Sequence, residues 1–331
     1  MEQGLVEQAG LNFEPISALG LRGKNPWTAL GGLWALGQGY RRSRQIMGRF
    51  RPDVLFVTGG YVCVPVTLAA YRQGTPIIIY LPDLEPGLAI KFLARFARRV
   101  AVTTPEAQKF FEPGLTVVTG YPVRSELFAA NHAGETSKVQ ARRRLGLSDD
   151  LPVLMVFGGS RGARTINRAI TEQLEAYLEI CQIIHVSGGL DEAWVKARRA
   201  QLPERLQARY QVFAYLHQDM VTALVAADLA ISRAGASVLG EFPAVGLPAV
   251  LIPYPYAGAH QALNANYLAR RQAAVIVNDA DLKRSLKETV LSLITHRATL
   301  ETMSRACQSL AQPEAASRLA QEILEVGGYG N

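Results

Sequence analysis

Short runs of apolar and β-branched residues alternate with longer segments of helical periodicity along the whole chain. Strongly apolar strands that alternate with helices form parallel sheets covered on both faces, so the pattern predicts an α/β protein. The predicted strands lie at residues 54–57, 76–80, 100–103 and 116–119 in the first half, and at 153–157, 183–186, 212–214, 229–231, 249–252 and 275–277 in the second.

The segment Tyr121–Asp150 interrupts this alternation with a proline, a polar stretch and three consecutive arginines. We expect the linker between two domains here, at residues 129–149. The N-terminal domain would then span 1–128 and the C-terminal domain 150–312. A last helix over about residues 313–328 can pack back on the first domain. A length of 331 residues suits two such domains.

Composition narrows the class of protein further. Hydrophobic residues make up 49% and charged residues 19% of the chain, as in ordinary globular proteins. The three cysteines lie far apart and lack metal-ligand spacing. We find neither a signal peptide nor an apolar run near the ~20 residues that cross a bilayer. The net charge of +7 leaves nucleic acid, an anionic membrane or a phosphorylated substrate open as partners.

The run Phe157-Gly-Gly-Ser-Arg-Gly-Ala163 follows a predicted strand and precedes a predicted helix. Its glycines would let the backbone approach an anion, and the helix N-terminus would supply N–H groups and partial positive charge. The spacing fits neither the dinucleotide fingerprint nor the Walker loop. The run therefore predicts either a pyrophosphate site or a tight turn that binds nothing.

A second run, Ser232-Arg-Ala-Gly-Ala-Ser-Val-Leu-Gly-Glu241, also follows a strand. Ser237 can cap the next helix or donate to a phosphate. Glu241, one turn into that helix, can accept hydrogen bonds from the two hydroxyls of a ribose. The alternative is an ordinary carboxylate stabilised by the helix dipole.

Two further segments offer polar groups near predicted strand ends. In His260-Gln-Ala-Leu-Asn264, Gln261 and Asn264 share a helix face, and their amides suit sugar hydroxyls. His260 is as compatible with a polar helix start as with a base or metal ligand. The turn Thr58-Gly-Gly-Tyr-Val-Cys-Val-Pro65 is a further anion-site candidate or a close-packed turn.

Taken in order, these motifs resemble the MurG family of glycosyltransferases, glycosyltransferase family 28. That family shows a GGY-x-x-x-P turn, a PG turn before a basic helix, and G-x-PVR, GGS-x-GA, R-x-GA-x-x-x-x-E and HQ-x-x-NA segments. The corresponding residues here are Gly59–Pro65, Pro86–Gly87, Gly120–Arg124, Gly158–Ala163, Arg233–Glu241 and His260–Ala265.

The resemblance implies a GT-B fold, in which two Rossmann-like doubly wound domains face a cleft. It implies an inverting transfer of N-acetylglucosamine from UDP-N-acetylglucosamine to undecaprenyl-diphospho-N-acetylmuramoyl-pentapeptide, a step of peptidoglycan synthesis. No metal or other cofactor is expected, and no Asp-x-Asp cluster stands where a metal–diphosphate site would need one. The implied location is peripheral, at the cytoplasmic face of the cell membrane, on an anionic lipid surface.

The resemblance also assigns roles to residues. Ser160 with the backbone of Gly158 and Gly159 would hold the donor diphosphate, and Arg124 would serve the same site. Glu241 would bind the ribose, and Gln261 with Asn264 the sugar. The backbone near Leu216 would read the uracil. The donor-binding set is completed by Arg161, Gly162, Arg233, Gly235 and Ser237.

On the acceptor side, the turn Gly59, Gly60 and Tyr61 would face the acceptor diphosphate. The family has H-E-Q-N before its PG turn, where this chain has Asp83 and Glu85. Asp83 can act as the general base or be a plain loop carboxylate. The family's opening strand and G-G-x-G-G-H loop have no counterpart here, so we expect the N-terminal domain to lack them.

Two basic, partly aromatic stretches suit an anionic membrane surface. We expect a helix through Leu88–Arg99, with Lys91, Arg95, Arg98 and Arg99 on one stripe beside Phe92, Leu93 and Phe96. Trp27, Leu30, Leu33 and Trp34 precede Arg41, Arg42 and Arg44. The alternative is a buried helix face with solvated arginines.

Three other functions stay open. A related UDP-sugar transferase could use another lipid or glycan acceptor. A remnant could bind the UDP-sugar without turnover. A nucleic-acid-binding module is suggested by charge alone, and neither a recognition helix nor an aromatic stacking platform supports it.

Overall fold

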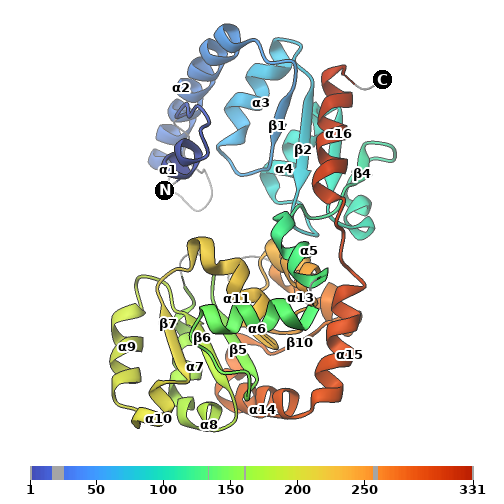
Figure 1. Ribbon diagram of the computed structural model, residues 1–331. Helices are drawn as coiled ribbons and strands as arrows, with labels where there is room; N and C mark the ends of the chain where they lie inside the picture. Colours follow the sequence, from blue (N-terminus) through green and yellow to red (C-terminus); the bar gives the residue numbers. More distant parts are fainter. Residues whose placement is uncertain (1, 17–25, 133, 160–161, 256–259, 330–331) are drawn as a thin grey trace. The chain divides into compact units, whose positions relative to one another are not determined.

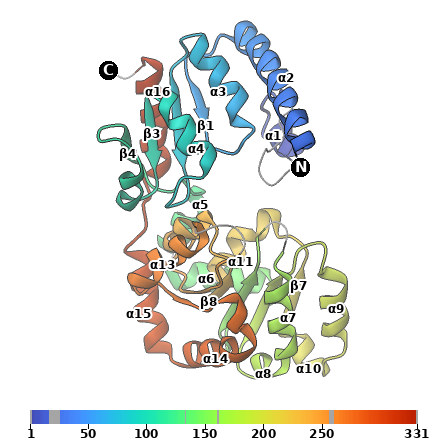
Figure 2. The same cartoon turned by 180° about the vertical axis from the view of Figure 1, so that it is seen from behind.

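The computed structural model describes residues 2–16, 26–132, 134–159, 162–255 and 260–329. The chain divides into two compact units (Figures 1 and 2). The first unit comprises Met1–Thr119 and Ser317–Asn331, and the second comprises Gly120–Ala316. In the described residues, β1 to β4 form one parallel sheet and β5 to β10 another, which confirms the predicted α/β class.

Every predicted strand occurs, with ends shifted by two residues or fewer. The strands are β1 (Leu55–Val57), β2 (Ile77–Leu81), β3 (Arg99–Val102), β4 (Thr116–Val118), β5 (Val153–Phe157), β6 (Gln182–Val186), β7 (Tyr210–Phe213), β8 (Leu229–Ser232), β9 (Ala249–Leu251) and β10 (Ala274–Ile276).

The helices lie between these strands and at both ends of the chain. They are α1 (Glu2–Gln8), α2 (Pro26–Phe50), α3 (Cys63–Arg72), α4 (Leu88–Leu93), α5 (Ser125–His132), α6 (Gly134–Arg144), α7 (Arg164–Glu172), α8 (Leu174–Leu178), α9 (Glu192–Ala200), α10 (Glu204–Gln207), α11 (Met220–Ala226), α12 (Glu241–Val245), α13 (His260–Arg270), α14 (Lys287–Thr295), α15 (Arg297–Gln308) and α16 (Ala315–Gly327).

The sheet of the first unit is covered on both faces, as its sequence requires. Strand β2 reads Ile-Ile-Ile-Tyr-Leu and is buried throughout. Successive side chains of a strand point to opposite faces. Ile77 and Ile79 therefore pack with α3 and α4, while Tyr80 packs against Leu319 of α16. The C-terminal helix thus belongs to the first unit, although most of its neighbours in sequence belong to the second.

The sheet of the second unit has the order β10-β9-β8-β5-β6-β7. Its central strand β5 pairs with β6 on one side and β8 on the other. The chain therefore proceeds outward from β5 to β7, returns to β8, and continues in the opposite direction. This reversal makes the β5–β8 boundary a topological switch point.

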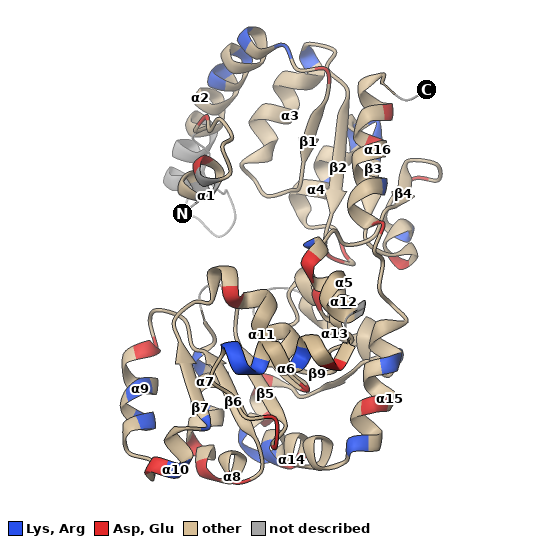
Figure 3. Ribbon diagram, viewed as in Figure 1, with Lys and Arg blue, Asp and Glu red and all other residues tan. Residues whose placement is uncertain are grey.

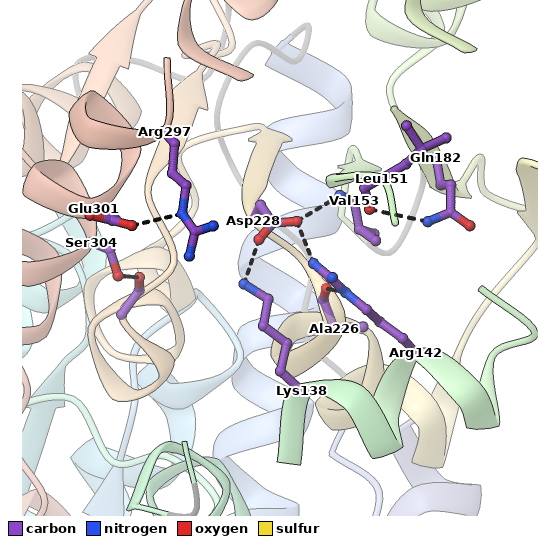
Figure 4. Close-up of polar contacts among 11 residues, drawn as sticks. Lys138, Arg142, Leu151, Val153, Gln182, Ala226, Asp228, Arg297, Glu301 and Ser304 are labelled. Atoms are coloured by element: carbon purple, nitrogen blue, oxygen red, sulfur yellow. Dashed lines mark hydrogen bonds and ion pairs between the residues drawn. The ribbon is translucent and has the colours of Figure 1, made fainter. Parts of the chain in front are cut away.

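Residues 129–149, expected to be a linker, instead lie within the second unit, mainly in α5 and α6. The reason is Asp228, at the amino end of β8. Its carboxylate accepts hydrogen bonds from Lys138 Nζ at 2.5 Å, Arg142 Nη2 at 2.6 Å and the Val153 amide at 2.7 Å (Figure 4). Arg142, buried, also donates from Nε to the Ala226 carbonyl. Arg142, in the run of arginines, thus anchors α6 within the second unit.

The basic helix expected through residues 88–99 is shorter than predicted. Helix α4 ends at Leu93, a single 3₁₀ turn follows at Ala94–Phe96, and Arg99 already begins β3. Arg99–Val102 forms a strand instead of continuing the helix because it pairs in register with Ile78–Leu81. Leu93 is fully buried, so it belongs to the core and not to a surface stripe. Among the described helices, none combines the length and apolarity needed to cross a bilayer.

Replacing Asp228 by alanine should destabilise the second unit strongly. The substitution would leave the buried Arg142 guanidinium without its carboxylate, and breaking a buried ion pair costs about 3–5 kcal/mol. Urea unfolding followed by circular dichroism measures the change. Asp219→Ala, which removes the exposed pair with Arg144, is the control and should unfold as the wild type does. Equal unfolding midpoints for the two variants would contradict the anchoring role.

Candidate functional site

The loops that follow β5 and β8 meet at the switch point of the second-unit sheet. Because these strands are adjacent and parallel, both loops leave the same edge, and their chains then run to opposite sides. Ligands of open α/β sheets bind in the crevice that such a divergence creates. Phe157, the last residue of β5, packs edge-to-face with Phe242 of α12, with 6.0 Å between the ring centroids. This contact connects the segments that flank the two loops. The topology therefore brings the first two sequence motifs together.

The loop after β5 needs its glycines. A Cβ on Gly158 would lie 2.3 Å from the Ala163 nitrogen, and one on Gly162, where φ is +74°, would lie 2.4 Å from the Ser187 carbonyl oxygen. Gly159, at φ +88°, is exposed and has open space beside it. Helix α7 starts directly after the loop without a side-chain cap. These features suit an anion at the helix N-terminus. Ser160 and Arg161 lie outside the described residues.

Glu241 lies where the loop after β8 ends, and two other residues predicted for the donor site interact with it. The Ser237 hydroxyl donates a hydrogen bond to its carboxylate, and the exposed Arg124 guanidinium is close enough to interact electrostatically. Burial raises the pKa of Glu241 above its ordinary value, although Ser237 and Arg124 oppose this shift. Glu241 is the first residue of α12, not one turn inside a helix, and Ser237 lies in a 3₁₀ turn (Ala236–Leu239) without capping it.

Arg124 reaches Glu241 because its own segment packs on the start of α12. A Cβ on Gly240 would lie 2.5 Å from Tyr121 Cδ1 and 2.8 Å from Val123 Cγ1, so only glycine admits this approach. Gly120, at φ +95°, turns the chain beside Ala315. The G-x-PVR segment and the second loop therefore form one structural group.

Arg233 and Asn264 are placed as supports of the loops. Arg233 pairs with Asp279 at 2.5 Å and donates to the Thr165 hydroxyl at 2.7 Å, and its side chain is only 10% exposed. Asn264 is fully buried and donates to the Ala234 carbonyl at 3.1 Å. Their side chains thus hold protein groups, and the direct donor contacts expected of them find no support in these hydrogen bonds.

The remaining donor candidates lie at the same edge of the sheet. Gln261, half-buried in the first turn of α13, accepts the Tyr254 amide hydrogen at 2.8 Å. Gly235 directly precedes the 3₁₀ turn, and a Cβ added to it would have no atom within 4 Å. Leu216 follows β7, two strands from β5, and is buried; its carbonyl accepts the Asp219 amide hydrogen.

In the first unit, the acceptor candidates also share one sheet edge. The Gly59–Gly60 turn follows β1, and Asp83 with Glu85 follows the neighbouring β2. Gly59, at φ +103°, contacts α4, since a Cβ there would lie 2.8 Å from Ile90 Cδ1. Tyr61 is exposed, and Glu85 pairs with Lys91 at 3.3 Å.

A cavity of about 620 Å³ occupies the other end of the second unit, at the amino ends of β5 and β8. None of the candidate site residues lines it. Its charged groups largely satisfy one another: Asp228 holds Lys138 and Arg142, and Arg297 pairs with Glu301 (Figure 4). Within the described ranges, no three His, Cys, Asp or Glu side chains gather as metal ligands would.

The sequence analysis missed a buried polar group beside the first loop. Arg164, the first residue of α7, donates to Asp191 at 2.8 Å, and Asn167 one turn later bonds both Asp191 and the Ser187 carbonyl. Asp191 is itself 3% exposed. A signal was present, since Asp191 follows Gly188-Gly189 directly after a strand, where parallel sheets collect polar residues.

Comparison with known proteins agrees with this architecture. The family model for the glycosyltransferase family 28 N-terminal domain matches residues 1–102, and that for the C-terminal domain matches residues 153–319. A relative from Roseiflexus sp. (strain RS-1) is 44% identical over 97% of this chain and 80% of its own length. A relative from Desulforudis audaxviator (strain MP104C) is 38% identical over 100% of this chain and 88% of its own length. Both are named UDP-N-acetylglucosamine–N-acetylmuramyl-(pentapeptide) pyrophosphoryl-undecaprenol N-acetylglucosamine transferase.

Solved structures show the same fold. MurG of Acinetobacter baumannii is 25% identical, with a TM-score of 0.73 over 98% of this chain and 88% of its own. A UDP-GlcNAc 2-epimerase from Neisseria meningitidis, solved with UDP-GlcNAc bound, has a TM-score of 0.69 over 98% of this chain and 88% of its own. Its sequence identity is 12%, so the likeness is one of fold alone. With both family models matched and relatives of this identity, the chain belongs to glycosyltransferase family 28 and has its GT-B fold.

Proposed function

We propose that the chain transfers N-acetylglucosamine from UDP-N-acetylglucosamine to undecaprenyl-diphospho-N-acetylmuramoyl-pentapeptide, with inversion at the anomeric carbon. The observation that carries this proposal is the switch point: Glu241, with its partners Ser237 and Arg124, follows β8, and the glycine loop with the start of α7 follows the adjacent β5. The names of the 44% and 38% identical relatives support the same donor and acceptor.

The donor site follows from the charges of a UDP-sugar. The diphosphate would lie against the Gly158–Gly162 loop, with Ser160, the α7 N-terminus and Arg124 as donors. In the reaction the bond from the anomeric carbon to the diphosphate oxygen breaks, and negative charge grows on the leaving UDP. Preorganised N–H groups and a guanidinium stabilise that charge as it develops. Glu241, as a carboxylate, would accept hydrogen bonds from the ribose hydroxyls, and Gln261 would bind the sugar.

The acceptor side would be the edge of the first-unit sheet described above. There the Gly59–Tyr61 turn would hold the acceptor diphosphate. The acceptor hydroxyl would attack the anomeric carbon and give its proton to a base, for which Asp83 is our candidate. A second candidate function is transfer to another lipid or glycan acceptor, and the observation that favours it is Asp83 and Glu85 in place of the family's H-E-Q-N.

We also propose that the first unit lies on an anionic membrane surface, at the cytoplasmic face. Leu88 is 70% and Phe92 41% exposed at α4, among the exposed cations Lys91, Arg95 and Arg98. On α2, Trp34 is 69% exposed, and basic residues gather in the C-terminal half of the helix (Figure 3). The side chains of Trp27, Leu30 and Leu33 lie outside the described residues. Apolar side chains flanked by cations bind anionic lipid surfaces.

Labelled N-acetylglucosamine should move from UDP-N-acetylglucosamine to the lipid-linked acceptor in the presence of the purified chain. Glu241→Ala should lower kcat/KM about 10- to 100-fold, since hydrogen bonds to a charged group are worth about 1.5–3 kcal/mol. Glu179→Ala, a surface carboxylate of the same unit, should leave the rate unchanged. Donor binding without transfer to any acceptor would contradict the proposed activity, and transfer to a different acceptor alone would support the second candidate.

The affinity for UDP-N-acetylglucosamine should fall on mild acidification. Because its pKa is raised, Glu241 takes up a proton at a higher pH than an ordinary glutamate, and the neutral form is a poorer acceptor for the ribose. The affinity is therefore highest at pH values above this raised pKa, and it falls as the pH drops through the pKa. Calorimetry from neutral pH down to the ordinary glutamate pKa measures the effect. In Glu241→Gln this dependence should be absent, and an equal dependence in both proteins would refute the assignment.

The double variant Leu88→Ser, Phe92→Ser should bind vesicles of phosphatidylglycerol more weakly, because it removes the apolar contacts of the patch. Burying each of these side chains in the membrane contributes about 1.5–3 kcal/mol, so the vesicle affinity measured by co-sedimentation should fall about tenfold or more. Leu324→Ser on α16, also half-exposed, is the control and should bind as the wild type does. Equal binding by the two variants, or wild-type binding to neutral phosphatidylcholine alone, would argue against this surface.

A further inference from the structure

A chain of hydrogen bonds crosses the interior of the second unit beside the first loop. It connects Tyr210 of β7, His185 of β6, Asn167 of α7, and Asp191, which precedes α9. All four side chains are buried, and His185 and Tyr210 are fully enclosed. Buried polar groups of this kind must find partners, and a network whose members are all satisfied fixes one arrangement.

The direction of each bond follows from one acceptor. The Ser187 carbonyl, which can only accept, lies 2.9 Å from Asn167 Nδ2, so the amide nitrogen faces it. Asn167 Oδ1 is then the acceptor facing His185 Nε2 at 3.0 Å, which therefore carries the hydrogen. His185 Nδ1 in turn accepts the Tyr210 hydroxyl hydrogen at 2.6 Å. Burial lowers the pKa of His185 to about 3, so this neutral tautomer persists at physiological pH.

Asp191 is the charged end of the network. Arg164 donates to its Oδ1 from both Nε and Nη2 at 2.8 Å, and Asn167 donates to its Oδ2 at 2.9 Å. Burial works against the carboxylate, but the hydrogen bonds from Arg164, Trp194 and Asn167 outweigh it and hold the pKa of Asp191 below its usual range. Asp191 is thus an anion that binds two residues of the first turn of α7.

The same network touches the end of the glycine loop. Gly162 lies so close to Ser187 and Gly188 that a Cβ would meet the Ser187 oxygen at 2.4 Å. Ser187 also receives the Asn167 amide, and Arg164 is two residues beyond Gly162. The final part of the loop and the start of α7 are therefore fixed to the segment Ser187–Asp191 at three points.

We propose that Asp191 is a positioning residue for the donor diphosphate, acting through Arg164 and Asn167 on the N-terminus of α7 and the adjoining Gly162. Asp191 itself need not touch the ligand. Its role is to hold the N–H groups of the first turn in the orientation that an anion requires, since a binding site depends on residues that lock its first contacts. This inference rests on the proposed use of a UDP-sugar.

Calorimetry with UDP tests the proposal on the full chain. Asp191→Asn keeps the size of the side chain and removes its charge, and Arg164→Gln breaks the same ion pair from an exposed side chain. Each should raise the Kd for UDP about tenfold, as loss of a supporting contact commonly does. The double variant should be no weaker than Asp191→Asn alone, because both changes break one connection. Arg205→Gln, which removes an exposed ion pair with Glu179, is the matched control and should bind as the wild type does.

The outcomes separate this inference from the proposed function. Wild-type affinity in Asp191→Asn and Arg164→Gln would overturn the positioning role while leaving the donor site intact. Additive losses, about a hundredfold in the double variant, would show that the two residues act independently and would also overturn it. Absence of UDP binding by the wild type would instead overturn the proposed function and the inference together. If Asp191→Asn fails to fold, the affinity of Arg164→Gln still tests the ion pair: a tenfold rise in Kd supports the positioning role, and wild-type affinity overturns it.

Discussion

The candidate site depends on the adjacency of β5 and β8 in one parallel sheet. The backbone hydrogen bonds between these strands set their register, so the loops after Phe157 and Ser232 begin at the same level of the same edge. From there one chain runs outward to β6 and the other to β9. The two loops, which are far apart in sequence, thereby begin at the same edge of the sheet.

The two ends of the second-unit sheet carry different tasks. At the amino ends, Asp228 holds Lys138 and Arg142 and so fixes α6 to the sheet. These charged side chains pair with one another, so they contribute to stability more than to binding. At the carboxyl ends lie glycine turns, a half-buried glutamate and a helix start without a side-chain cap, which we propose as the donor site. In our proposal Asp191 combines the two tasks, because it is a buried ion that would support the donor-binding loop.

Local patterns in the sequence predicted the strands and the glycine turns well. A buried strand such as Ile77–Leu81 can be recognised from its apolar, β-branched composition. Glycines such as Gly158 and Gly240 occupy places where any side chain would collide with the backbone or a neighbouring side chain. Long-range pairing could not be predicted in this way. The segment 129–149 looked like a linker because it is polar and basic, and the partner of Arg142, Asp228, is 86 positions away in the sequence. The protein partners of Arg233 and Asn264 are likewise distant in sequence, so these contacts could not be predicted from the local motifs.

Hydrogen–deuterium exchange with and without UDP-N-acetylglucosamine tests most directly whether the crevice at the β5–β8 boundary is the donor site. Our account predicts that the ligand slows exchange in peptides covering residues 158–167, 233–241 and 260–264, while the peptides that line the cavity at the amino ends are unaffected. Protection confined to that cavity, or unchanged exchange at saturating ligand in all three segments, would contradict it.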